Sequence, residues 1–238
     1  METNPSHKFE RRAWRRNAAY KLAAGFATFI VVAHLPGCAL FRPPANPALV
    51  SASEGAEALS ISDALEALIE HGKDTPSDRD YAWAEVKKRP AVSAEDLFAR
   101  AAIGGRVVQS KGLLAAPLIP QIEEYARQSR DLDPSFRGGA AARLLGTLYV
   151  MAPAKFLRHG DSETGIDLLE ELTVKYPEVP ENQLRLAEAY VALSDAASAV
   201  PHLCECLKHK ASLRRDDQDL LAHLIEEIGT PDCKDIDR

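Results

Sequence analysis

The chain has 238 residues, of which 46% are hydrophobic and 27% charged, and its net charge at neutral pH is −6. This balance is typical of a globular protein, and the length suits one folded domain with a leader, or two small domains. The charge is unevenly placed, since residues 1–37 carry a net charge of +4 and the remaining chain carries −10. So acidic a domain lacks the clustered Lys and Arg that nucleic-acid phosphates require, and we expect no nucleic-acid partner.

The first 37 residues have the organisation of a secretory signal peptide. A basic stretch from Lys8 to Lys21 precedes 14 apolar residues, Leu22 to Leu35. This run is shorter than the roughly 20 residues that a membrane-spanning helix requires. We therefore predict a signal peptide over residues 1–37, with an uncleaved signal anchor as the alternative.

The apolar run ends in Leu35-Pro36-Gly37-Cys38, which resembles a bacterial lipobox. In such sequences a diacylglycerol alkylates the cysteine thiol, and the chain is cleaved just before the cysteine. The resemblance implies lipidation at Cys38, membrane lipid as a partner, and a lipid-anchored protein of the bacterial cell envelope. Ala39, in place of aspartate, favours the outer membrane, with the domain facing the periplasm.

Composition divides the rest of the chain in two. Residues 38–60 are rich in Pro, Ser and Gly and are predicted to be a tether. Residues 61–238 are predicted to be all-α, because apolar residues recur three and four positions apart among good helix formers. The first expected helices are Ser62–His71, Asp78–Lys88 and Ser93–Gly104. Asp78 and Ser93 are the expected N-caps of the second and third of these helices. The glycine pairs at 104–105 and 138–139 are predicted to end helices.

Three hairpins with the pattern of a tetratricopeptide (TPR) repeat follow, and such repeats stack into an array. The clearest unit carries its large and small residues at Leu186, Ala187, Tyr190, Ala199, Leu203 and Cys206. The preceding unit has Gly146 and Gly165 at the small positions, and an earlier one pairs residues 97–101 with 122–134. A final helix, Leu213–Ile228, is expected to cap the stack.

Two features depart from a regular repeat. Pro201 falls inside an expected helix, which must start late with Ser198 as its cap, or kink. The middle unit carries a long insert, Ala152–Gly160, followed by Asp161 or Ser162 as the next helix cap. Its aromatic, apolar and basic residues are Phe156, Leu157, Arg158 and His159. Such residues favour interfaces, and we predict that these four bind a partner; a brace packed on the neighbouring hairpin is the alternative.

The chain resembles the TRAP-transporter-associated T component (TatT) family of periplasmic lipoproteins, which have degenerate TPR hairpins. The resemblance spans about residues 60–228 and rests on Arg143–Tyr149, Ala152-Pro153, Gly160-Asp161, Leu168–Glu170 and Pro180–Ala187. It implies about three repeats with a C-terminal capping helix, and a protein that docks the solute receptor of a TRAP-type transporter. It also implies homo-oligomers of the chain. An envelope scaffold unrelated to transport is the alternative function.

Three cysteines remain besides Cys38. A Cys204–Cys233 disulfide would pin the C-terminal tail across the last helices, but spacing alone leaves the pairing open. His202, Cys206 and His209 have the spacing of metal ligands on one helix face. Three ligands from one helix do not easily surround a tetrahedral ion, so we predict no metal site. A zinc or thiol enzyme built on these residues is a third alternative.

The sequence contains no motif for a nucleophile elbow, a phosphate-binding loop, a dinucleotide or a metalloprotease site. Several acidic pairs are interpreted as solvated helix faces: Glu123–Glu124, Glu170–Glu171, Asp216–Asp217 and Glu226–Glu227. We therefore predict a binding protein that has no catalytic residue and no cofactor.

Overall fold

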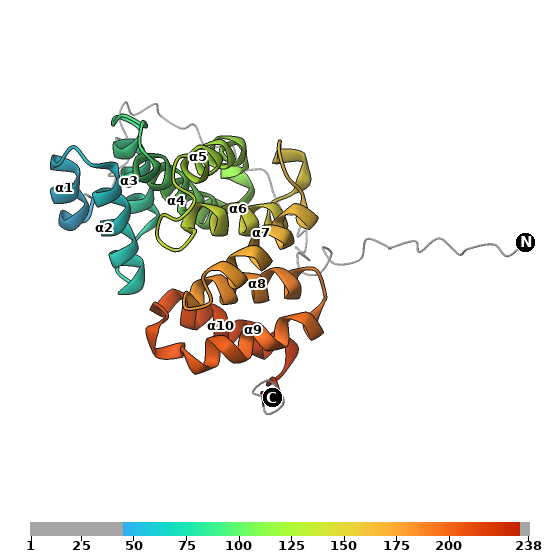
Figure 1. The fold of residues 1–238 in the computed structure, drawn as a ribbon. Coiled ribbons are helices and arrows are strands. Elements are labelled where there is room, and N and C mark those ends of the chain that lie inside the picture. The colour runs from blue at the N-terminus through green and yellow to red at the C-terminus, as the bar shows by residue number, and fades with distance from the viewer. Residues whose placement is uncertain (1–44, 234–238) are drawn as a thin grey trace, which may run out of the picture. The chain divides into compact units, whose positions relative to one another are not determined.

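The computed structural model describes residues 45–233 (Figure 1). Within this range the chain forms α-helices and short 3-10 segments and no β-strand, which confirms the predicted all-α fold. None of the helices in this part of the chain is long and apolar enough to cross a bilayer. The predicted signal peptide and Cys38 lie outside the described residues.

Three helices precede the predicted repeats: α1 (Pro47–Glu54), α2 (Ala58–Glu70) and α3 (Pro76–Val86). The tether predicted over residues 38–60 is therefore shorter, because α1 and the start of α2 belong to the folded domain. Leu49 of α1 is fully buried in the core cluster that α2 and α3 share. The Arg89 guanidinium donates hydrogen bonds to the carbonyl oxygens of Ser53 and Gly55, which holds the other end of α1.

Local chemistry explains why a proline-rich stretch begins a helix. Pro47 occupies the first turn, where a missing N–H costs no hydrogen bond and the fixed φ suits the helix. The Asn46 side chain accepts a hydrogen bond from the backbone nitrogen of Ala48. At α3, Thr75 is the N-cap instead of Asp78. Asp78 lies in the first turn, and its carboxylate accepts from the Thr75 nitrogen at 2.9 Å, completing a capping box.

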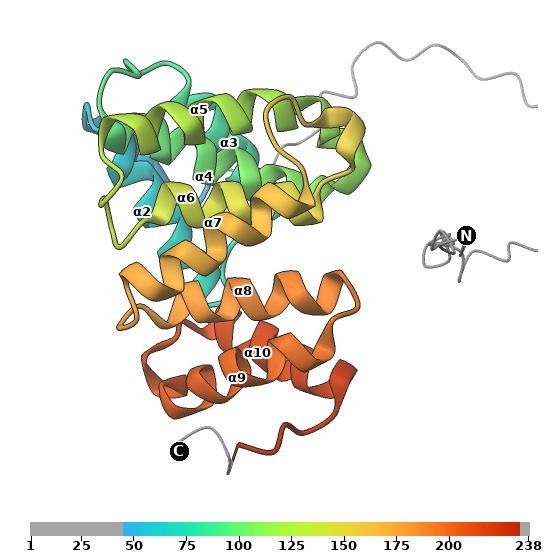
Figure 2. The same cartoon turned by 45° about the vertical axis from the view of Figure 1, so that its right-hand side comes forward.

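Three antiparallel hairpins stack on one another after α3, and they are seen best in Figure 2. They are α4 (Ala94–Lys111) with α5 (Ile119–Leu132), α6 (Ala140–Met151) with α7 (Ser162–Lys175), and α8 (Pro180–Ala192) with α9 (Ala196–Lys208). The last helix, α10 (Arg215–Ile228), packs on α8 and α9 and covers the end of the stack, as predicted.

The glycine pairs do not end helices as predicted. Helix α4 continues through Gly104 and Gly105 for another turn and a half. A Cβ on Gly104 would lie 2.8 Å from Ile122 Cγ1, so this glycine lets α5 approach closely. The helix ends at Gly112, whose φ of 55° favours glycine. The pair 138–139, with φ values of 62° and 80°, precedes α6 and so begins a helix.

Small residues lie where the hairpins cross, as the repeat pattern predicts. A Cβ on Gly165 of α7 would lie 2.8 Å from the Gly146 carbonyl oxygen of α6, so the two backbones are nearly in contact. In the next hairpin, Ala187 of α8 and Ala199 of α9 are both fully buried in one cluster. Close crossings of this kind bring the larger neighbouring side chains together in the space beside them.

Helix α9 does not have the late start that was the first of the two alternatives. Asp195 is its N-cap, and the carboxylate accepts a hydrogen bond from the Ser198 nitrogen at 3.2 Å. Ser198 is therefore a first-turn residue and not the cap. Pro201 lies inside the helix, so the helix contains the proline without a late start.

Helices α2, α4 and α10 meet at an ion-paired cluster, which we call the ionic seam: Glu66 (α2), Arg106 (α4), Arg214 (the N-cap of α10) and Asp216 (α10). Arg106 donates to Glu66 Oε1 at 2.7 Å and to Asp216 Oδ2 at 2.8 Å. Burial by itself would raise the pKa of Glu66, but the hydrogen bonds and charges of Arg106 and Arg214 outweigh it and hold that pKa below its usual value.

Next to the seam, α10 also pairs with α8. Arg185 donates to Asp217 Oδ1 at 2.6 Å, and Asp217 is only 1% exposed. The interpretation of Asp216–Asp217 as a solvated pair is therefore wrong, because both carboxylates bind arginines of other helices. The pair Glu226–Glu227, at the other end of α10, is exposed as predicted.

Candidate interaction site

The insert Ala152–Gly160 connects α6 to α7 at one end of the middle hairpin. Pro153 follows the last turn of α6, and a short 3-10 segment covers Ala154–Phe156. Of the two caps expected for α7, Asp161 is the one observed. Its carboxylate accepts a hydrogen bond from the Thr164 nitrogen at 2.9 Å. Each end of the insert is thus fixed by its helix.

A buried carboxylate of α5 holds the middle of the insert. Glu123 is fully buried, and its two oxygens accept hydrogen bonds from successive backbone nitrogens, Arg158 at 2.9 Å and His159 at 2.8 Å. The interpretation of Glu123 as a solvated residue is therefore wrong. A sequence signal was present, since Glu123 lies beside Ile122 and three residues before Ala126, both on the buried face of α5.

Tyr149 and Gly160 also hold the insert in place. Burial, together with the charge and hydrogen bond of Glu123, raises the pKa of Tyr149 to about 12. A Cβ on Gly160 would lie 2.4 Å from Tyr149 Cε2, so the insert packs its backbone against the ring. Sequence reasoning did not assign either residue to the site, because both contacts depend on how the chain returns from the insert.

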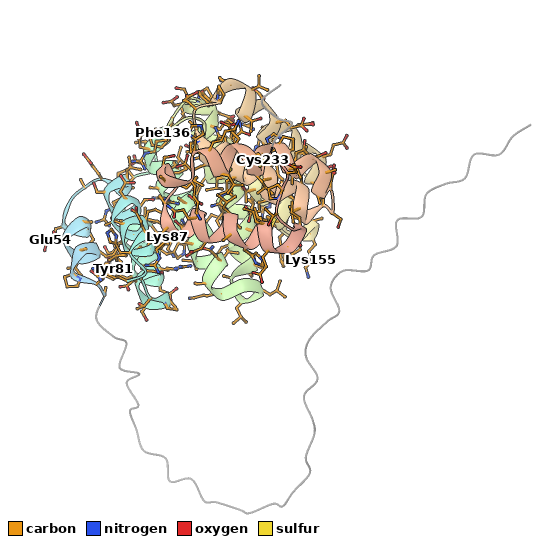
Figure 3. The ribbon with its side chains drawn as sticks, turned by 90° about the horizontal axis from the view of Figure 1, so that it is seen from below. Glu54, Tyr81, Lys87, Phe136, Lys155 and Cys233 are labelled. Carbon is orange, nitrogen blue, oxygen red and sulfur yellow. A yellow bond between two sulfur atoms is a disulfide. The ribbon has the colours of Figure 1, made fainter. Side chains whose placement is uncertain are left out.

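The four residues predicted to bind a partner divide into two groups. Leu157 packs on the cluster formed by α4, α5 and α6, as the brace alternative expects. Phe156 is half-buried, while Arg158 and His159 are exposed. Lys155 Nζ lies 4.9 Å from the centre of the Phe156 ring, and Figure 3 shows Lys155 at the rim of the domain. The insert is therefore a brace through its backbone and Leu157.

We call the outward-facing residues the insert surface: Lys155, Phe156, Arg158 and His159. His159 Nε2 lies 3.9 Å from Glu124 Oε2, a contact that is charged only when the histidine is protonated. Arg158 is exposed at a fixed backbone position. A fixed backbone has already lost the conformational entropy that a mobile loop would lose on binding, and aromatic and arginine residues are frequent interface anchors.

The structure shows which of the C-terminal cysteines pair, a question that their spacing in the sequence left open. Cys204 of α9 and Cys233 form a disulfide with a Cα–Cα distance of 5.6 Å, and it attaches the segment after α10 to the last hairpin (Figure 3). Cys206 is free and fully buried. Burial raises the pKa of the Cys206 thiol to about 12, so the reactive thiolate is disfavoured.

The side chains with metal-ligand spacing on α9 point to different partners. His202 Nδ1 lies 2.7 Å from Gln183 Oε1, and burial lowers the pKa of His202. His209 is exposed beside Glu205, whereas Cys206 is enclosed against α8. Among residues 45–233 no three His, Cys, Asp or Glu side chains are grouped to hold a metal ion.

A small hollow lies between α5, α6 and α7. Its volume is about 70 Å³, and it is lined by Arg130, Pro134, Ala142, Leu168, Glu171, Leu172 and Lys175. Sites for small organic ligands usually enclose roughly 300–1,000 Å³, so this hollow is too small for one. Searches of protein-family models and of curated proteins find no match to this chain.

Proposed function

We propose that this chain is a non-catalytic helical-repeat lipoprotein, anchored by a lipid on Cys38, that binds a protein partner in the bacterial cell envelope. The observation that carries the proposal is the insert surface. Glu123 fixes the backbone of the insert, and Phe156 and Arg158 extend from that fixed backbone. A preorganised loop of this kind favours binding, since little ordering is required when a partner arrives.

The disulfide supports the proposed compartment. Structural disulfides form and persist in the periplasm and other oxidising environments and are rare in the cytosol. The Cys204–Cys233 pair is therefore what we expect of an exported protein. It is independent of the N-terminal sequence that predicts export, because it lies at the other end of the chain.

The charged groups of the array support binding over catalysis. Buried acids and bases of the described residues form ion pairs between helices, such as Arg106 with Glu66 and Arg185 with Asp217. Groups paired in this way stabilise the fold and are not directed at a cavity that could hold a substrate. The thiol with the raised pKa, Cys206, is likewise unsuited to nucleophilic attack.

The partner we propose is the solute receptor of a TRAP-type transporter, by the resemblance of the sequence to the TatT family. The chemistry of the insert surface is cationic and aromatic, so the complementary patch on the receptor is acidic with an apolar centre. An envelope scaffold is the alternative function, in which another envelope protein binds the same surface.

Cross-linking in intact envelopes followed by capture of this chain tests the proposal. We expect a TRAP solute receptor among the captured proteins, and its loss with the double variant Phe156→Ala, Arg158→Ala. The matched control is Lys88→Ala, Val92→Ala, which removes a cation and an apolar side chain from another surface, where Val92 is 77% exposed.

The control variant should unfold at the parent's temperature, because its side chains are exposed. The insert variant should unfold at a somewhat lower temperature, because Phe156 is half-buried, and its helical circular-dichroism spectrum should show that it still folds. Capture of other envelope proteins without a receptor would contradict the transport role and support the scaffold. Equal capture by the insert variant and the parent would contradict the insert surface as the binding site.

A further inference from the structure

The folded domain begins close to the proposed anchor. Six residues, 39–44, separate Cys38 from the first described residue, Ala45. Even fully extended, they reach at most about 25 Å. A tether ending at residue 60 would have allowed the domain to move far from the bilayer. Because α1 is part of the core, the start of α1 instead stays next to the membrane whenever Cys38 carries a lipid.

The beginning of α1 lies at the same end of the domain as the end of α4. The Asn46 nitrogen donates to Asp78 Oδ1 at 2.8 Å, and Lys111 Nζ lies 2.5 Å from Asp80 Oδ1. Asp78 and Asp80 are two residues apart in the first turns of α3, a rise of about 3 Å along its axis. Helix α3 therefore places the start of α1 and the end of α4 at nearly the same level along its axis.

Two adjacent leucines are exposed at this end. The 3-10 segment Gly112–Leu118 follows α4; its Leu113 is 66% exposed and its Leu114 is 89% exposed. Ala115 and Ala116 of the same segment are buried, so the segment is packed down while its leucines point out. Single exposed leucines are common on protein surfaces, whereas two in succession on an ordered segment form a small apolar patch that another apolar phase can cover.

We propose that Leu113 and Leu114 insert into the bilayer and are a second membrane contact beside the lipid on Cys38. This inference rests on the proposed anchor, which keeps this end of the domain within reach of lipid. A tethered surface meets its target at high effective concentration, so the nearby bilayer is favoured over a diffusing protein as the occupant. Leu113 and Leu114 would add an apolar contact to that of the two acyl chains of the diacylglycerol on Cys38, and would fix which end of the domain faces the bilayer.

A tryptophan reporter tests the insertion in the full chain. We would reconstitute the Leu114→Trp variant into vesicles of phosphatidylglycerol and brominated phosphatidylcholine, whose bromine atoms quench tryptophan in the acyl region. The matched control is Val174→Trp, at a residue 83% exposed near the end of α7 farther from the insert. Relative to the parent, whose Trp14 and Trp83 supply the background emission, we expect a blue shift and strong quenching for Leu114→Trp, and neither for Val174→Trp.

Intact mass of the same samples reports whether Cys38 carries lipid, which separates the two proposals. A lipidated Leu114→Trp protein with unshifted, unquenched emission overturns the insertion and leaves the anchor standing. Quenching without lipid on Cys38 supports the insertion and overturns the anchor. Absence of both overturns both. A blue shift that requires added envelope protein, without bromine quenching, assigns the leucines to a protein partner and overturns the insertion.

Discussion

The crossing of α6 and α7 and the ionic seam join helices by opposite means. At the crossing, Gly146 and Gly165 remove side chains so that two backbones nearly touch. At the seam, Glu66, Arg106 and Asp216 are long or charged side chains that bridge helices through hydrogen bonds. The crossing is stabilised by dispersion and apolar burial, which depend little on pH or salt. The seam depends on charge and changes with both.

The two regions also differ in how far apart their residues lie in the sequence. The crossing joins neighbouring helices, whereas the seam joins Arg106 to residues 40 and 110 positions away, and Arg214 to Glu66 across 148 positions. Local hairpins form with little loss of chain entropy, and the seam can form only after the array has stacked. We infer that each hairpin is a local unit of the array, and that the ionic seam holds α2 and α4 against α10.

The largest expected effect is at the crossing. Gly165→Ala places a methyl group 2.8 Å from the Gly146 oxygen and 2.9 Å from Val150 Cγ2, so α6 and α7 must separate. We expect a loss of about 3 kcal/mol in the free energy of unfolding, measured by urea titration with circular dichroism. The loss should be the same at low and high salt. A variant as stable as the parent would contradict the close approach of the two helices.

A smaller loss is expected at the next crossing, where the small residue is already an alanine. Ala187→Leu adds three carbon atoms to a fully buried position facing α9, and we expect a loss of about 1–3 kcal/mol. Thermal unfolding of the variant beside the parent measures it. An unchanged melting temperature would mean that the space at Ala187 can relax, in contrast to the backbone contact at Gly165.

The stability that the ionic seam contributes should depend on the charge of Glu66. Glu66→Gln keeps the shape of the side chain and removes its charge while Arg106 retains Asp216, so we expect a loss of about 1–2 kcal/mol at neutral pH. Raising the salt concentration should shrink this loss, unlike that of Gly165→Ala. Equal salt responses in the two variants would contradict the assignment of the seam as electrostatic.

The Glu66 carboxylate also predicts how the stability of the protein depends on pH. The folded-state pKa of Glu66 lies below its ordinary value of 4.5, so folding favours the ionised form. Its contribution is therefore fully present above about pH 4.5 and is lost as the pH falls through the lower folded pKa. The parent should lose stability faster than Glu66→Gln over that acidic range. Parallel pH profiles of the two proteins would show that Glu66 is not the responding group.

The contrast explains what the sequence could predict. Ala187 and Ala199 occur at the spacing of the repeat, and Gly146 and Gly165 occupy the same repeat positions on either side of the insert Ala152–Gly160, so the crossings are visible in the pattern. Asp217 carries no such signal, because its partner Arg185 is 32 residues away and a pair of aspartates has the same appearance on a solvated face. Ion pairs between distant helices depend on the stacked geometry, which no local period encodes.

The candidate site likewise has features that the sequence predicts and features that it does not. The insert, with its half-buried Phe156 and exposed Arg158, was predictable, because the connection is longer than a turn needs and has the composition of an interface. The role of Glu123 was not, since it binds backbone nitrogens 35 and 36 residues away. Composition also obscured α1, because proline at the first helical position favours a helix while a proline-rich stretch suggests a tether.

The smallest expected effect has the opposite sign and tests why the glycines are there. Gly105 lies inside α4, and a Cβ built on it meets no atom within 4 Å. Gly105→Ala should therefore stabilise the protein by about 0.5–1 kcal/mol, because alanine loses less conformational entropy in a helix than glycine does. Urea titration beside Gly165→Ala makes the comparison: the same substitution in two helices should change the free energy of unfolding in opposite directions. If both variants are destabilised, the cost at Gly165 cannot be assigned to the crossing, and the α6–α7 contact loses its explanation.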